Sequence, residues 1–191
     1  MSKSRRTLLR EAAAAALIGP LAAEAAQHVH DAAAASAKTT GGVFKPKALT
    51  AHEFETLQVL SEIIVPGARK AGAAEFVDVL STGSKQMLAI FSGGIAWLDA
   101  EMRRRFEADF LTAKAEQRTQ LLDLIAYRKN ASPELNPGIN FFDWARRMSV
   151  DAYFTSKEGI AELGFKGNNG MAEFQVPVEA LQYALKRSPF A

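Results

Sequence analysis

Apolar residues recur at helical spacing along most of this chain, and no stretch shows sustained alternation of apolar and polar residues. In residues 50–66, Thr50 and Glu53 form a capping-box pair, an apolar face continues to Ile64, and Pro66 ends the pattern. Similar apolar faces recur in residues 76–80, 95–110, 121–125, 141–152 and 177–186. The sequence therefore predicts an all-α fold, a compact multi-helix bundle.

Turn and cap signals predict where these helices begin and end. The Ser-Gly-Gly triplet at 92–94 is expected to interrupt the middle of the chain. Asn140 is expected to cap the aromatic-rich helix that follows it. Thr155 and Glu158 form a second capping-box pair, for a short helix that Gly164 ends.

The N-terminal segment has the composition of an export signal. A positively charged stretch that contains Arg5 and Arg6 precedes a mildly apolar run over residues 12–23, and small residues follow it. This run is too short for a membrane span, which needs about 20 apolar residues. The adjacent arginines resemble a twin-arginine signal, which directs folded and often cofactor-loaded proteins across a bacterial inner membrane. The alternative is a basic tail that is amphipathic or disordered.

This pattern divides the chain into two parts. Residues 1–37 are predicted to form the twin-arginine signal segment and an Ala-rich linker, and residues 38–191 the helical domain. Cleavage sites of the Ala-x-Ala kind occur at 23–25 and 35–37, and the composition of residues 26–46 predicts a linker. The expected location is the periplasm, reached through the twin-arginine translocase.

Charge and cysteine content exclude several classes of function. The chain of 191 residues has a formal net charge of +2, whereas nucleic-acid-binding proteins carry a clustered basic face, so no nucleic-acid partner is expected. The sequence contains no cysteine, which excludes disulfides, thiolate metal ligands and a cysteine nucleophile.

No set of residues in the sequence has the spacing of a catalytic, cofactor-binding or metal site. His52 is the histidine of the predicted folded region and is expected to be exposed or to cap its helix. His28 and His30 alone would make an incomplete metal site. Asp99 and Glu101 lie two positions apart on a predicted helix, so they point to different faces. The sequence thus predicts a chain that is not an enzyme by itself.

Aromatic residues are concentrated in residues 140–168. They spread around the predicted helix more widely than one buried face can accommodate. Either this helix is buried on all sides, or part of its surface docks a partner through aromatic anchors and a polar rim. On the second interpretation, the candidate interface consists of Phe142, Trp144, Tyr153, Phe154, Lys157, Phe165 and Asn168.

Two motifs resemble the gluconate 2-dehydrogenase subunit 3 family. The first is LTAHEFETLQVLSEIIVPGARKAGAAEFVDVL, which starts at Leu49 and has Pro66, Gly72 and Asp78 where that family places its turn and second helix. The second is YFTSKEGIAELGFKGN, an aromatic pair and Thr-Ser followed by a Leu-Gly-aromatic-x-Gly-Asn tail that ends at Asn168. Together the motifs span most of the predicted helical domain.

The resemblance implies an accessory subunit. Members of the family accompany a large flavoprotein of the glucose–methanol–choline type, which holds FAD and oxidises a sugar or sugar acid. A cytochrome c subunit with haem c often completes the complex. The small subunit carries the twin-arginine signal, here Arg5 and Arg6, and supports maturation and export of the flavoprotein. The resemblance implies no catalytic, cofactor-binding or metal residue in this chain, and a periplasmic complex associated with the inner membrane through its partners.

Two other functions stay open on the sequence alone. A free-standing periplasmic helical module could bind a small ligand in an apolar pocket, with no flavoprotein beside it. A cofactor-dependent enzyme could hold a site that no sequence pattern reveals. The three hypotheses differ in whether the chain needs a partner and in whether the purified chain oxidises sugars alone.

Overall fold

The structure of the chain, a computed structural model, describes residues 18–164 and 176–188, with side chains from Ala25 onward. Every regular element in these residues is helical: α2 (Ile18–Thr39), α3 (Ala51–Ile64), α4 (Ala73–Gly83), α5 (Lys85–Phe106), α6 (Ala115–Ile125), the 3-10 turn η1 (Arg128–Asn130), α7 (Asn136–Phe154), α8 (Lys157–Glu162) and α9 (Val178–Arg187). The all-α prediction is therefore confirmed. The arginine pair of the predicted export signal, Arg5 and Arg6, lies outside the described residues.

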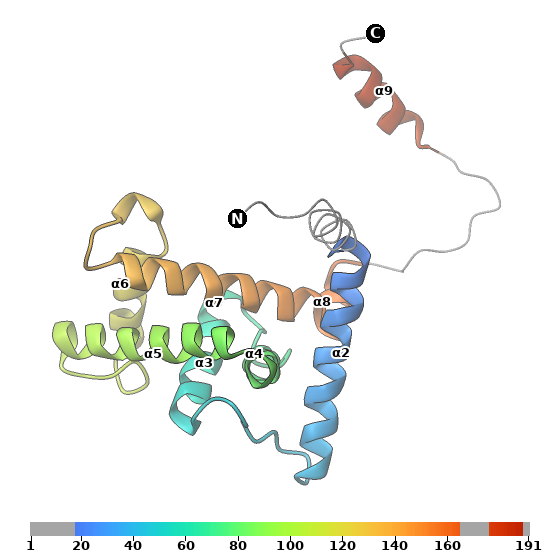
Figure 1. Ribbon diagram of the computed structural model, residues 1–191. Helices are drawn as coiled ribbons and strands as arrows, with labels where there is room; N and C mark the ends of the chain where they lie inside the picture. The colour runs from blue at the N-terminus through green and yellow to red at the C-terminus, as the bar shows by residue number, and fades with distance from the viewer. Residues whose placement is uncertain (1–17, 165–175, 189–191) are drawn as a thin grey trace, which may run out of the picture.

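Helices α5 and α7 lie side by side at the centre of the bundle (Figure 1). They approach closely because a glycine faces an aromatic ring at two points. A Cβ on Gly94 of α5 would lie 2.0 Å from the ring of Phe141, and a Cβ on Gly138 of α7 would lie 2.2 Å from the ring of Trp97. Phe141 also packs edge to face against buried Phe91, with ring centroids 6.0 Å apart. The central helix pair therefore depends on the absence of a side chain at these glycines.

The main hydrophobic core forms where α3, α4 and α6 pack against this central pair. Its largest fully buried side chains are Leu57, Leu60, Val77, Phe91, Ile95, Leu98, Met102, Phe110, Leu121 and Ile125. Most of them lie on the apolar faces that helical spacing predicted, because an amphipathic helix has one stripe to turn toward its neighbours.

Two buried carboxylates attach non-helical segments to this core. Asp78 of α4 accepts hydrogen bonds from the backbone N–H groups of residues 47–49, at 2.9, 3.0 and 2.8 Å. Asp99 of α5 accepts a hydrogen bond from the backbone N–H of Phe110 at 2.9 Å, and its other oxygen lies 2.6 Å from Nε2 of His52. A buried carboxylate is stabilised when several N–H groups surround it. Both acids therefore have structural roles.

Helix α2 occupies residues whose composition predicted a linker. The prediction for residues 26–46 is wrong as far as Thr39, since α2 is helical up to that residue and packs across α4. Ala26 is buried in a second, smaller apolar cluster, and Nε2 of His30 lies 3.0 Å from Oγ1 of Thr155. Alanine has the highest intrinsic helix propensity, so an Ala-rich segment becomes helical when one of its faces contacts a surface.

Some helix boundaries follow the local signals. The capping box is confirmed, with the backbone N–H of Glu53 donating to Oγ1 of Thr50 at 3.2 Å and the backbone N–H of Thr50 donating to the Glu53 carboxylate at 2.7 Å. Gly164 follows α8 with a φ of 62°, as predicted for a helix end. The predicted interruption at residues 92–94 is wrong, because these glycines lie inside α5, where one of them allows the ring of Phe141 to approach.

Two other predicted caps are wrong. Asn140 lies inside α7, which begins earlier because Pro137 in its first turn is favourable at a helix start. Thr155 does not cap α8. Instead, the side chain of Ser156 accepts a hydrogen bond from the backbone N–H of Gly159 at 3.2 Å. Thr155 is the C-terminal cap of α7, so only Thr155 and Ser156 separate the two helices.

Candidate partner interface

One side of α7 carries side chains that a partner could contact. Residues three or four positions apart lie on the same side of a helix, and this side, the α7 outer face, consists of Asn140, Asp143, Trp144, Arg147, Val150, Asp151 and Phe154. Val150 is 37% exposed and Phe154 36% exposed. The opposite side of α7 carries buried residues such as Ala145 and Ala152. Burial thus divides α7 into a core side and an accessible side.

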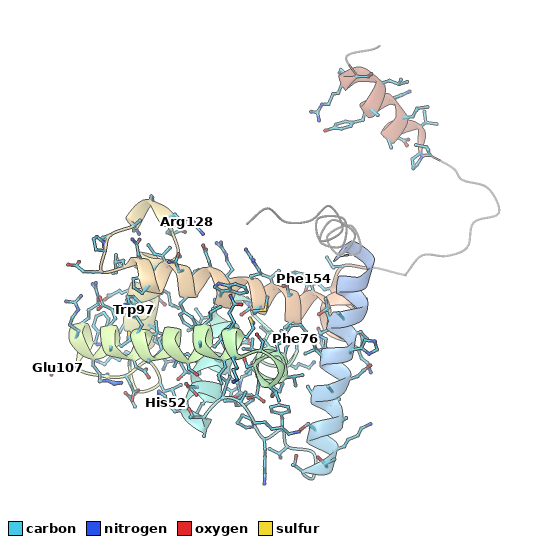
Figure 2. All side chains as sticks on the ribbon, viewed as in Figure 1. His52, Phe76, Trp97, Glu107, Arg128 and Phe154 are labelled. Atoms are coloured by element: carbon cyan, nitrogen blue, oxygen red, sulfur yellow. The ribbon has the colours of Figure 1, made fainter. Side chains whose placement is uncertain are left out.

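At its N-terminal half, the α7 outer face combines an aromatic ring with charges. The guanidinium of Arg147 lies 5.4 Å from the centroid of the half-buried Trp144 ring, and Asp143 forms an ion pair with Arg128 of η1. These side chains line a depression of about 400 Å³. Figure 2 shows Arg128 beside this end of α7 and Phe154 at the other end. Sequence reasoning missed Arg147, although its spacing of three residues after Trp144 could have revealed it.

At its C-terminal end, α7 presents one anchored and one accessible aromatic ring. The Tyr153 hydroxyl donates a hydrogen bond to the Glu162 carboxylate at 2.5 Å, and this bond raises the pKa of Tyr153. The Tyr153 ring also covers Gly67, where an added Cβ would lie 3.0 Å from it. Phe154 packs edge to face on Tyr153, with centroids 5.1 Å apart. Tyr153 thus connects α7 with α8 and the turn after α3, whereas Phe154 stays accessible.

The structure separates the predicted interface residues. Phe142 is only 8% exposed in the main core, so a partner cannot reach it in the folded chain. Trp144 and Phe154 share the α7 outer face, and Lys157 is exposed in the first turn of α8. Outside the described residues lie Phe165 and Asn168.

An apolar groove lies between α2, α4 and α7. It has a volume of about 420 Å³ and is lined by Ala25, Ala26, Val29, Phe76, Leu80, Met148, Asp151 and Thr155. Burial raises the pKa of Asp151, and the positive charge of Arg147 partly opposes that shift. Sequence reasoning could not locate this groove, because one of its walls is the helix that composition predicted to be a linker.

His52 and Asp99 have structural contacts in this structure. Within residues 18–164 and 176–188, no three His, Asp or Glu side chains are grouped so that they could hold a metal ion. His52 is 45% exposed at its side chain, as predicted, and contacts Asp99, which in turn holds the segment after α5 through the backbone of Phe110. Among the described helices, none combines the length and the apolar character that a membrane span needs.

Comparison with known proteins identifies the family. Residues 51–174, well over half of the chain, match the family described as gluconate 2-dehydrogenase subunit 3. Neither the curated proteins nor the solved structures gave a significant match. The matched range starts at the first residue of α3 and includes α8, while α2 and α9 lie outside it. The chain therefore belongs to the gluconate 2-dehydrogenase subunit 3 family.

Proposed function

We propose that this chain is the small, non-catalytic subunit of a periplasmic FAD-dependent dehydrogenase that oxidises a sugar or sugar acid. The family match carries the proposal, since membership indicates an accessory subunit of a dehydrogenase complex. In this proposal the large flavoprotein, of the glucose–methanol–choline type, holds FAD, and a cytochrome c subunit holds haem c. Arg5 and Arg6 direct the small subunit and its flavoprotein to the twin-arginine translocase.

The α7 outer face supports the choice of contact surface. Interfaces are enriched in aromatic residues and arginine, and their strongest contacts come from side chains that lose all contact with water on binding. Trp144 is already half-buried beneath Arg147, so its side chain would lose little conformational entropy when a partner covers it. We therefore assign Trp144, Arg147 and Phe154 to the flavoprotein contact.

Export of the flavoprotein tests the role of the signal. The full chain is co-expressed with a flavoprotein subunit that has no signal of its own, and flavin-dependent sugar oxidation is measured in the periplasm. Changing both Arg5 and Arg6 to Lys should reduce that activity at least severalfold, while the matched change Arg10→Lys should leave it in place. Equal periplasmic activity with and without the arginine pair would show that the chain does not escort its partner.

Co-purification tests the contact surface. Trp144→Ala and Phe154→Ala should each weaken flavoprotein binding by about tenfold, the effect of losing one interface anchor. Ile63→Ala is the matched control, because Ile63 is 42% exposed on α3 and is not a residue of the α7 outer face. Thermal unfolding of each isolated variant shows whether the fold is kept. Folded variants that bind as tightly as the parent chain would remove α7 from the interface.

The apolar groove favours a second candidate, a free-standing helical module that binds a small apolar ligand. Ligand pockets are concave and mainly apolar, with few polar groups to orient the ligand, and the groove has this composition. Native mass spectrometry of the chain purified from its own cells distinguishes the two functions. A flavoprotein bound to the chain supports the first, and a small molecule on a monomer supports the second.

A further inference from the structure

Helix α9 has an apolar stripe that no other part of the structure buries. Val178, Leu181 and Leu185 lie on one side of the helix, and they are 63%, 49% and 52% exposed. None of the residues of α9 is buried, and in this structure α9 lies apart from the bundle (Figure 1). Isolated helices shorter than about 12–15 residues are marginal in water. A helix of 10 residues therefore needs a surface to stabilise it.

The groove between α2, α4 and α7 is an apolar surface of the required kind. Its α2 wall consists of Ala25, Ala26 and Val29, which are small enough to leave room for the side chains of another helix. Its other walls are largely apolar and come from α4 and α7. The groove thus suits a short helix that presents three aliphatic side chains in a row.

The charges of the two surfaces are complementary. Asp151 is the charged residue among those that line the groove. The last turn of α9 carries Lys186 and Arg187. A helix seated in the groove can therefore place its basic end near Asp151.

The chain is long enough to bring the two surfaces together. Thr155 lines the groove and is followed almost at once by α8, so the chain leaves α8 close to the groove. The segment between Gly164 and Val178 can span up to about 45 Å when fully extended. A tether of this length gives α9 an effective concentration of about a millimolar at its own bundle, whereas a separate molecule must reach that concentration in solution.

We propose that α9 seats its Val178, Leu181 and Leu185 stripe in the groove between α2, α4 and α7 of the same chain. Docking covers the groove and gives α9 the tertiary contacts that its length requires. The inference concerns this chain alone, so it holds or fails independently of the proposed flavoprotein.

Distance measurement between two spin labels tests this inference. The sequence contains no cysteine, so labels can be attached to Glu116→Cys on α6 and Ala180→Cys on the polar side of α9 in the full, uncleaved chain. Docking predicts a distance distribution in which one narrow component is the larger part. A distribution without a narrow component in the parent chain would overturn the proposal.

Variants on both sides of the contact make the test specific. Leu181→Asp combined with Leu185→Asp should reduce the docked population by about tenfold, because burying carboxylates in the groove is unfavourable. Ala25→Glu changes an exposed residue of α2 that lines the groove, and it should also reduce the docked population. The matched change Ala35→Glu, at an exposed residue of the same helix outside the groove, should leave the docked population unchanged. A narrow distribution that survives the groove and stripe substitutions would contradict docking at this site.

Dilution with unlabelled chain distinguishes the same chain from a second copy. If α9 occupies its own groove, the narrow component keeps its amplitude when the labelled chain is mixed with excess unlabelled chain. If α9 occupies the groove of another copy, the component disappears on dilution, and the intramolecular proposal is wrong.

Discussion

Helices α2 and α9 flank the segment that matches the family, yet they relate to the bundle in opposite ways. Helix α2 packs across α4, buries Ala26 and brings His30 within 3.0 Å of Thr155. Helix α9 buries no residue in this structure. Both are helical segments outside the matched range, so the difference lies in the surfaces that their side chains can meet.

The size of the inward side chains explains this difference. Helix α2 presents alanines, which allow its backbone to approach the ring of Phe76, and the ring of His30 packs against that ring at a tilt, with centroids 5.1 Å apart. Helix α9 presents valine and leucine, which need a groove to fill. An amphipathic pattern is therefore enough to specify a helix, but its place depends on a surface of matching shape.

The largest expected change in the free energy of unfolding is at the contact between α5 and α7, and the changes expected for the two flanking helices are smaller. Gly94→Ala would place a Cβ 2.0 Å from the ring of Phe141, and we expect it to lower the free energy of unfolding by about 3 kcal/mol through overpacking. Gly93→Ala, with nothing within 4 Å of its Cβ, should stabilise α5 by up to about 1 kcal/mol. Chemical denaturation of both variants measures the contrast. Equal effects at the two positions would mean that α5 and α7 do not approach as closely as described.

A smaller effect is expected where α2 joins the matched segment. Asp78→Ala removes the acceptor for the backbone N–H groups of residues 47–49, the stretch that leads from α2 into α3. We expect a loss of about 2 kcal/mol in the free energy of unfolding, since part of this backbone regains hydrogen bonds from water. Asp78→Asn keeps one acceptor oxygen and should lose about half as much. Denaturant titration checks both, and an unchanged midpoint for Asp78→Ala would show that the carboxylate is dispensable.

The apolar stripe of α9 should contribute less to the free energy of unfolding than Gly94 or Asp78. Leu181→Asp combined with Leu185→Asp should lower the free energy of unfolding by about 1 kcal/mol, the value that corresponds to a docked population several times larger than the undocked one. Ala180→Asp, on the polar side of α9, should change it by less than about 0.5 kcal/mol. Thermal unfolding of the full chain is the measurement. If the stripe variant and the control variant had the same stability, the prediction would be wrong, because α9 would then make no stabilising contact through its stripe.

The smallest effect is the pH dependence of α2 docking. Burial lowers the pKa of His30 below its ordinary value of 6.5, although the backbone of Ala152 and the carboxylates of Asp31 and Glu158 oppose the shift. The folded state then binds fewer protons than the unfolded state, so the contribution of His30 is complete above pH 6.5 and is lost as the pH falls through the folded-state pKa.

Hydrogen exchange checks this pH dependence. Amides of α2 should exchange faster, after correction for intrinsic rates, at pH 5.5 than at pH 7.5. His30→Gln should remove the difference, whereas His28→Gln, exposed on the same helix, should keep it. A pH effect that persists in His30→Gln would assign it to another group.

Local signals predicted the features that depend on neighbours in sequence. The capping box at Thr50 and Glu53 needs only three residues of spacing, and its hydrogen bonds form as the pattern predicts. Trp144 and Phe154 lie on the accessible side of α7, whereas Phe142, in the same aromatic run, is in the core. Composition could not separate them, because the separation depends on which side of α7 meets α5.

Contacts between distant segments were beyond sequence reasoning. The Ser-Gly-Gly triplet at 92–94 had the composition of a break, yet it lies inside α5, where the ring of Phe141, far along the chain, packs against Gly94. The boundary predicted between residues 37 and 38 falls within α2. Asp78 and Asp99 had no recognisable signal of their role, since their partners are backbone groups of other segments.

The sequence alone revealed the helical periodicity, the capping box and the two family motifs, because each depends on residues a few positions apart or on a pattern of residue types. They were sufficient for the all-α class and for the family. The accessible side of α7, the groove behind α2 and the roles of the buried carboxylates came from the fold. Such features form only when helices distant in sequence pack together, and packing depends on shapes that no local pattern encodes.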